Sequence, residues 1–352
     1  MGRLVLDRRL KPELTPARAS AFSCVLRRLK IGIVVLALSG GPHPTIAETP
    51  RPVEFTSVQQ VRHLKSSTSG VFSVHLHGVV TYYDTVAPNL FVQDSTGGIW
   101  IDLHNSTTKP PSPGEVLDLY GTVGFGFSPY IQNPRWSVTG KSSAPKPRLI
   151  SYDDAATGTF DGQWVQLDGV VRSFVQQVEG NVLLIDVATP TGAFKVRVPA
   201  YQGPFPVQLV DAKVRFSGVC RASFNGRNQF ISFHVLMPSL QNIQVLNAPP
   251  ADPFAVPVIP IADVRRFSVS LPDEHRVRIV GTVTARFPQQ GLYMTDGSDG
   301  LYAESQDVGW IQEGDQVTVI GFPASGSFSP VLKSASFRAT GRHFLPTITP
   351  IT

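Results

Sequence analysis

The sequence predicts an all-β protein built from three similar units that follow one another along the chain. The chain has 352 residues, of which 30 are glycine and 30 are proline, and only 16% are charged. Glycine and proline are costly inside helices and useful in the turns between strands, so this composition disfavours a helix-rich protein. With 42% hydrophobic residues the chain is too apolar for disorder, and its length predicts two or three globular domains.

The positive charge of the chain is concentrated in its first 47 residues. The formal net charge is +5, and residues 1–47 contain eight basic and two acidic residues. The remainder therefore holds 23 basic and 24 acidic residues. A body this close to neutral lacks the electrostatic attraction that provides most non-specific affinity for nucleic acids. Nucleic acid is therefore disfavoured as a partner.

Residues 1–47 have the features of a leader that contains an export signal. Basic residues at 27–30 precede an apolar run at 31–38, and small residues at 45–47 form a cleavage site. Cleavage after Ala47 would place the mature protein in the periplasm or outside the cell, with Cys220 as its only cysteine. The apolar run is shorter than the roughly 20 residues that span a bilayer, so a retained anchor is the weaker alternative. We expect Cys220 to be a small buried hydrophobe rather than a reactive thiol.

Comparison of the chain with itself reveals an internal repeat. The spacings of two outer copies agree, since Gly78 precedes Asp94 by 16 residues and Gly281 precedes Asp296 by 15. Four blocks recur in the same order in these copies: 74–81 and 277–284, 90–101 and 291–302, 113–121 and 313–321, and 127–129 and 328–330. A looser middle copy comprises 164–171, 182–186, 194–198 and 212–218.

Each copy is expected to form five strands, because its apolar and polar residues alternate. Asp94–Gly98 and Asp296–Gly300 predict tight hairpins between the second and third strands. Gly78, Gly169 and Gly281 lie inside long first strands, where glycine often marks a bulge or bend. A five-stranded, partly open barrel with a bent first strand is the OB architecture. We place OB-like barrels at 51–143, 148–247 and 258–342, and a tail at 343–352.

Short helices are predicted to lead into the outer barrels and to plug their bottoms. Apolar residues recur there at every third position: Val58, Val61 and Leu64 in the first copy, and Ile261, Val264 and Phe267 in the third. Asp153 and Asp154 follow Ser151 at another apparent helix start, where helix capping explains these carboxylates without any chemistry.

Aromatic residues of the first copy are the best candidates for ligand contact. OB barrels commonly bind oligomers on the second and third strands and adjoining loops, where rings stack on bases or sugars. The predicted ligand-binding residues are Tyr82, Tyr83, Trp100, Phe127 and Tyr130. The alternative that about half of the aromatic rings in this copy fill the barrel stays open. In the third copy Tyr293 and Tyr302 stand where Phe91 and Trp100 stand in the first, which indicates structural positions.

The sequence contains no recognisable catalytic motif. It has no Gly-x-Ser-x-Gly elbow, no His-Glu-x-x-His, no phosphate-binding loop and no kinase motif. His75 and His77 have a spacing that zinc could use, but a zinc site needs a third ligand. The loop at 296–300 resembles part of a calcium loop without the later carboxylate. We therefore predict no enzymatic activity, no catalytic residue, no metal site and no cofactor.

Several motifs resemble the extracytoplasmic sensor region of certain bacterial membrane-bound histidine kinases. The resemblance lies in Leu76–Tyr83, Leu90–Gly98, Asp161–Val165 and Ala251–Phe254 and covers about residues 51–342. In that family tandem OB-like modules precede a membrane span and cytoplasmic signalling domains, so the resemblance implies an input module without chemistry of its own. This sequence ends at Thr352 without a membrane helix or kinase core. It would then be either a truncated sensor kinase or a free periplasmic protein that uses the same modules.

Three functions from different classes remain open at this stage. The leading one is a non-catalytic periplasmic binding or sensory module that recognises a small molecule, an oligomer or another protein. The second is a stand-alone exported protein that binds single-stranded nucleic acid or oligosaccharide. The third is a structural spacer that binds nothing, for which replacing Tyr83 or Trp100 by alanine would change only stability. Membrane contact is expected only if the leader is retained or the chain is a truncated sensor.

Overall fold

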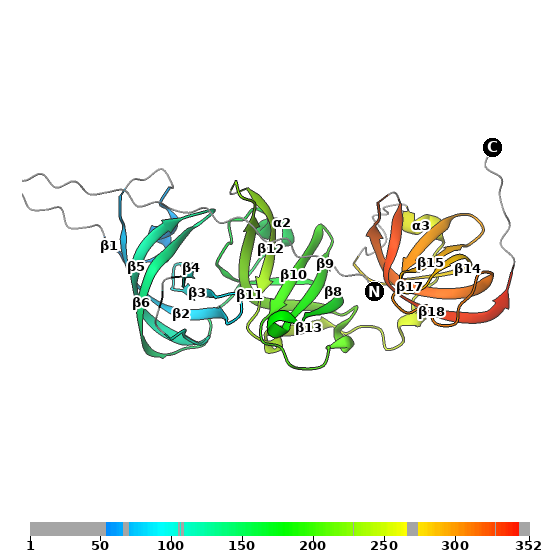
Figure 1. Ribbon diagram of the computed structural model, residues 1–352, viewed down its shortest axis with the longest axis horizontal. Helices are drawn as coiled ribbons and strands as arrows, with labels where there is room; N and C mark the ends of the chain where they lie inside the picture. The colour runs from blue at the N-terminus through cyan, green and yellow to red at the C-terminus, as the bar shows by residue number, and fades with distance from the viewer. Residues whose placement is uncertain are drawn as a thin grey trace, which may run out of the picture. The chain divides into compact units, whose positions relative to one another are not determined.

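The computed structural model (Figure 1) describes residues 54–65, 70–104, 106, 109–227, 229–265, 274–327 and 329–344, and strands make up more than half of these residues. The predicted leader at 1–47, Phe267 and residues 345–352 of the predicted tail lie outside these residues. The described strands form three sheets in chain order, and each sheet contains a closed ring of five strands. The prediction of an all-β protein with three tandem OB-like barrels is confirmed.

The five barrel strands pair in the same way in each sheet. The first strand pairs with the second and fourth, and the fifth pairs antiparallel with the fourth and parallel with the third. This pairing is the topology of the OB fold. Barrel 1 consists of β2 (Ser73–Asp84), β3 (Asn89–Gln93), β4 (Gly98–Asp102), β5 (Glu115–Phe125) and β6 (Pro129–Lys141). Barrel 2 consists of β8 (Trp164–Gln177), β9 (Val182–Thr189), β10 (Gly192–Val198), β11 (Lys213–Phe224) and β12 (Phe230–Leu236). Barrel 3 consists of β14 (Val277–Phe287), β15 (Gly291–Thr295), β16 (Gly300–Glu304), β17 (Asp315–Ser325) and β18 (Pro330–His343).

Short additional strands extend the first two sheets beyond the five predicted strands. They are β1 (Glu54–Phe55), parallel to β2; β7 (Arg148–Leu149), parallel to β8; and β13 (Ile243–Asn247), antiparallel to β11. Single turns of 3-10 helix connect other strands at Glu179–Asn181, Val207–Leu209, Leu240–Asn242 and Pro253–Ala255.

A five-residue α-helix precedes each barrel: α1 (Val58–Arg62), α2 (Tyr152–Ala156) and α3 (Ile261–Arg265). Ser151 caps α2 in a reciprocal capping box with Asp154, as its sequence position predicts. Val58 and Val61 are fully buried in the core of barrel 1, and Ile261 and Val264 belong to the core of barrel 3, so these helices close their barrels as expected. No helix in the described part of the chain is long and apolar enough to cross a membrane.

The two predicted hairpin aspartates also hold the helices in place. Oδ1 of Asp94 accepts hydrogen bonds from the backbone of Thr96 and Gly97, while its Oδ2 accepts from the Val58 N–H at 2.8 Å. Asp296 repeats this arrangement, with Oδ2 accepting from the Ile261 N–H at 2.8 Å. One carboxylate therefore shapes the turn and caps the neighbouring helix, which explains why both repeats place aspartate here.

The glycines inside the first strands allow a close approach rather than a special dihedral angle. A Cβ atom at Gly78 would lie 2.6 Å from Cγ1 of Val92 and 2.9 Å from the carbonyl oxygen of Gln93. Gly281 is equally close to Met294 and Thr295. The backbone of the first strand thus lies so close to the second strand at this point that no side chain fits, as in a small closed barrel. The bulges predicted nearby begin two residues further on, between Val80 and Tyr82 in barrel 1.

Candidate functional site

The strand registers identify equivalent outward-facing positions in the three barrels. Phe91 on β3 is paired with Trp100 on β4 in barrel 1. The corresponding pairs are Asp186 with Lys195 in barrel 2 and Tyr293 with Tyr302 in barrel 3. Because OB barrels bind ligands on their second and third strands, these pairs mark the centre of the candidate binding face of each barrel.

In barrel 1 this face is covered by barrel 2. Tyr82 and Phe91 are fully buried, and they share one hydrophobic cluster with Trp164, Val219 and Leu236 of barrel 2. Trp100 packs against the same cluster. Burial first, and then the charge of Asp84, raises the pKa of the Tyr82 phenol. Residues from two barrels therefore form a single apolar contact, which occupies the surface where a ligand would bind.

Arg221 on β11 fills the space beside this cluster. Its guanidinium lies 5.1 Å from the ring of Trp100, and 5.7 Å from the rings of both Phe91 and Phe224. Its Nη1 also lies 3.4 Å from Oδ1 of Asp161, whose side chain is almost fully buried. Cation–π contacts of this kind strengthen when water is excluded. A barrel 2 arginine thus occupies the aromatic face of barrel 1.

Polar contacts made by α1 and β2 of barrel 1 add to the junction. Arg62 on α1 donates to the carbonyl oxygens of Asp161 at 2.6 Å and Thr159 at 2.9 Å. The side chain of Asp84, which is 0% exposed, accepts from Nε of Arg197 at 3.1 Å. The Asp84–Arg197 pair therefore links β2 of barrel 1 to β10 of barrel 2.

The five residues predicted to bind a ligand are distributed around this junction. Trp100 and Tyr130 have ring centroids 5.0 Å apart, and Phe127 stacks on Phe224 of barrel 2 at 5.7 Å. Tyr82 offers no surface to a ligand, because it is buried in the junction. Tyr83 points to the other side of its strand and packs against the core of barrel 1. Four of these five rings lie at or beside the contact of barrel 1 with barrel 2.

Barrel 2 has charged groups at the equivalent positions. Lys195 and Asp186 form an ion pair, and the Ser173 hydroxyl donates to Asp186 at 2.7 Å. His234 lies opposite Lys195 on β12, and burial, with Lys195 and Arg197 nearby, lowers its pKa. Neither member of the Asp186–Lys195 pair is aromatic.

Barrel 3 is the one whose candidate face is both aromatic and open. Tyr293 is 47% exposed and Phe287 is 42% exposed. The Tyr293 ring lies 4.8 Å from that of Tyr302 and 5.9 Å from that of Phe287. Beside Tyr293 and Tyr302 is a hollow of about 620 Å³, within the size range of ligand sites. The hollow is lined by Tyr293, Tyr302, Glu304, Ser325, Gly326, Ser327, Ser329, Val331 and Lys333.

The lining of this hollow combines aromatic, charged and hydroxyl groups. Its lining contains one cation, Lys333, one carboxylate, Glu304, two tyrosines and three serine hydroxyls. Tyr302 donates its hydroxyl proton to the Gln290 carbonyl oxygen at 2.8 Å, which orients the ring. Burial, and then the nearby Glu304, raises the pKa of Tyr302, so the phenol stays neutral at physiological pH.

The other candidate residues have structural partners. Nε2 of His75 lies 2.7 Å from Oδ1 of Asp118, and its ring stacks on Tyr120. Cys220 is fully buried, as predicted, and burial first, then Asp161, raises the pKa of its thiol to about 12. Among the described residues, no three His, Cys, Asp or Glu side chains are placed to hold a metal ion.

The sequence repeat contains the aromatic pair of barrel 3, but the pair was predicted to be structural rather than ligand-binding. Alignment of the repeats places Tyr293 and Tyr302 on Phe91 and Trp100, which led to the expectation of structural positions. The structure shows that the equivalent pairs have different surroundings: Phe91 is buried, whereas Tyr293 is half exposed. At the middle of the strand, tyrosine in place of phenylalanine is the sequence difference that accompanies this exposure.

Comparisons with known proteins give only distant similarities. No family model and no curated protein matches this chain. Among solved structures, a murine DNA-binding protein bound to double-stranded DNA is 13% identical over 53% of this chain and 98% of that chain, with a TM-score of 0.23. The Ifi202 HINa domain in complex with 20-bp double-stranded DNA is 13% identical over 49% and 95%, with a TM-score of 0.22. The aspartyl-tRNA synthetase of Entamoeba histolytica is 8% identical over 52% and 51%, with a TM-score of 0.23. At these low TM-scores, the fold assignment depends on the strand pairings of the chain itself.

Proposed function

We propose that this chain is a non-catalytic binding module of the sensory type that acts after export and recognises an oligosaccharide on the open aromatic face of barrel 3. The observation that supports this most directly is the contrast between equivalent faces. Barrel 1 uses its aromatic pair to contact barrel 2, whereas barrel 3 leaves Tyr293 and Tyr302 beside a hollow. Exposed aromatic rings next to polar groups are typical of ligand sites.

The composition of the hollow favours sugars over nucleic acids. Rings of tyrosine stack on the apolar faces of either sugars or bases, so stacking alone does not discriminate. Hydroxyls of Ser325, Ser327 and Ser329 can exchange hydrogen bonds with sugar hydroxyls. A nucleic-acid strand would need several cations along its phosphates, and the lining has only Lys333.

The sensory and extracytoplasmic parts of the proposal come from the sequence. They rest on the resemblance of residues 51–342 to the input region of sensor histidine kinases and on the export signal. The export step has its own test: mass spectrometry of the chain recovered from the extracytoplasmic fraction should give a mature form that begins at Glu48. Recovery of the uncleaved chain in the cytoplasm alone would refute it.

The binding proposal is tested with purified protein on a panel of neutral and acidic oligosaccharides and on single-stranded oligothymidylate. We expect one or more oligosaccharides to bind, and Tyr293→Ala to weaken binding about tenfold, the effect of losing roughly 1.4 kcal/mol of contact. Tyr120→Ala is the matched control, because Tyr120 is 43% exposed on barrel 1. The proposal is refuted if no oligosaccharide binds or if both variants bind alike. Binding to oligothymidylate alone that falls steeply with salt would assign the face to nucleic acid instead.

A further inference from the structure

Trp310 is a large hydrophobic side chain that the fold leaves in water. It is 98% exposed, on the connection between β16 and β17 of barrel 3. A tryptophan side chain contributes 150–250 Å² of mainly apolar surface when it is buried, so this position forgoes a large stabilisation. Packing within the described chain gives no reason for tryptophan at this site.

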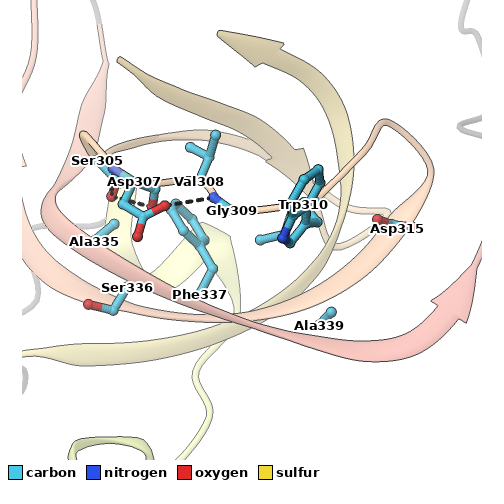
Figure 2. A pocket seen from close by; sticks show the side chains of 11 residues that line it. Ser305, Asp307, Val308, Gly309, Trp310, Asp315, Ala335, Ser336, Phe337 and Ala339 are labelled. Carbon is cyan, nitrogen blue, oxygen red and sulfur yellow. Dashed lines mark hydrogen bonds between the residues drawn. The ribbon is translucent and has the colours of Figure 1, made fainter. Parts of the chain in front are cut away.

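Trp310 stands at the rim of a pocket that is separate from the Tyr293 hollow. The pocket has a volume of about 470 Å³ and lies between the β16–β17 connection and β18. Figure 2 shows the Phe337 ring between the carboxylate of Asp307 and the indole of Trp310, with Asp315 beyond the indole. No residue lines both this pocket and the Tyr293 hollow.

The charges that line this pocket are negative. Asp307 and Asp315 both line it, and the lining includes no lysine, arginine or histidine. Asp315 is already engaged, since it accepts from the Gln312 N–H at 2.8 Å and pairs with His343 at 3.2 Å. The hydrogen bond from Gln312, and then that from His343, lowers the pKa of Asp315 and keeps it ionised.

Asp307 is held in place but has no cationic partner among the described residues. Its Oδ1 accepts from the Gly309 N–H at 2.9 Å, and its backbone N–H donates to the Ser305 hydroxyl at 3.3 Å. Arg286 contacts the same loop, since its Nη2 donates to the Gly309 carbonyl oxygen at 3.0 Å. Arg286 binds the backbone of the loop and does not line the pocket, whereas Asp307 does line it.

From this geometry we infer a second binding site: the pocket takes a small organic cation with a guanidinium or alkylammonium group. The cation would stack on Trp310 and Phe337 and pair with Asp307. Aromatic faces attract cations within about 6 Å of the ring, and a carboxylate beside them adds a directed charge. The volume suits one small free molecule rather than a protein surface. This site is independent of the Tyr293 face and of the oligosaccharide proposed there.

The test follows the indole N–H resonance of Trp310 by NMR in the full chain. The protein has four tryptophans, and loss of one resonance in Trp310→Phe assigns the signal. The probe is N-acetyl-arginine amide, and its uncharged isostere N-acetyl-citrulline amide is the ligand control. We expect the arginine compound to shift the Trp310 resonance saturably and the citrulline compound to bind at least tenfold more weakly, because it lacks the charge.

Variants separate this site from non-specific attraction. Asp307→Asn keeps the acceptor for the Gly309 N–H and removes the charge, so the loop should persist while affinity falls about tenfold. Glu313→Gln removes a charge from the same connection outside the pocket lining and should leave affinity unchanged. The other three indole resonances report whether each variant stays folded. Equal binding of the two ligands, equal affinity of Asp307→Asn and Glu313→Gln, or no shift of the Trp310 resonance overturns the inference.

Discussion

Replacing Trp164 by alanine should separate barrel 1 from barrel 2. Trp164 lies on β8, is 4% exposed, and shares its cluster with Tyr82 and Phe91 of barrel 1. Truncation of a buried tryptophan typically costs about 3–5 kcal/mol, from lost burial and the cavity that remains. The matched control is Trp310→Ala, the same substitution at 98% exposure, for which we expect about 0.5 kcal/mol or less. The free energies of unfolding should therefore differ by roughly 3 kcal/mol.

Urea unfolding measures this difference, and hydrogen exchange locates it. Protection should fall in β3, β4 and β8, on both sides of the cluster, and should be unchanged in β14 to β18. A double-mutant cycle with Phe91→Ala should be clearly non-additive, because either substitution opens the same contact. If Trp164→Ala costs no more than Trp310→Ala, or if protection falls only within barrel 2, the two barrels are not held together by this cluster.

Two further perturbations test the polar junctions. Asp84→Asn should lower the free energy of unfolding by about 3 kcal/mol, because it leaves the Arg197 guanidinium without its buried carboxylate. Asp252→Asn, at the exposed Asp252–Arg338 pair, should cost less than about 0.5 kcal/mol, and equal urea midpoints for the two variants would contradict this account. The hydrogen bond to Asp211 raises the pKa of His275, although partial burial of the ring opposes this shift. The stabilisation from this pair is therefore fully present below the ordinary histidine pKa, and it is lost as the pH rises through the raised pKa. Asp211→Asn should therefore lower the urea midpoint more at pH 5.5 than at pH 8.5, and a larger loss at pH 8.5 would show that the sign is wrong.

The architecture was predictable because its determinants are local and repeated. Asp94 and Asp296 each begin a hairpin whose geometry needs only neighbouring residues, and the alternation of the strands places one face inward. The second function of these aspartates, as acceptors for the N–H groups of Val58 and Ile261, was not predictable, because it joins residues 35 or 36 positions apart. Sequence spacing alone does not determine such a distance.

The candidate site was predicted only in part, because its exposure depends on how barrels pack. Aromatic rings on barrel 1 were identified from residue type, and residue type does not reveal that Trp164 and Arg221 cover them. The same limit applies to Arg62, which is distant in sequence from its acceptors Thr159 and Asp161. A sequence repeat shows which residues are equivalent in different barrels, but it does not show which residues of one barrel contact another.

The consecutive burial of strand residues nevertheless distinguishes the covered face from the open one. In β3, Leu90, Phe91 and Val92 are all buried, so this strand is covered on both faces. In β15 the equivalent residues are buried, exposed and buried, with Tyr293 in the middle. At the middle position the two strands differ by one hydroxyl: phenylalanine can be enclosed without a hydrogen-bond partner, whereas enclosing a tyrosine leaves its hydroxyl to be satisfied. At this position the phenylalanine of β3 is covered by barrel 2, whereas the tyrosine of β15 keeps its hydroxyl within reach of solvent or a ligand.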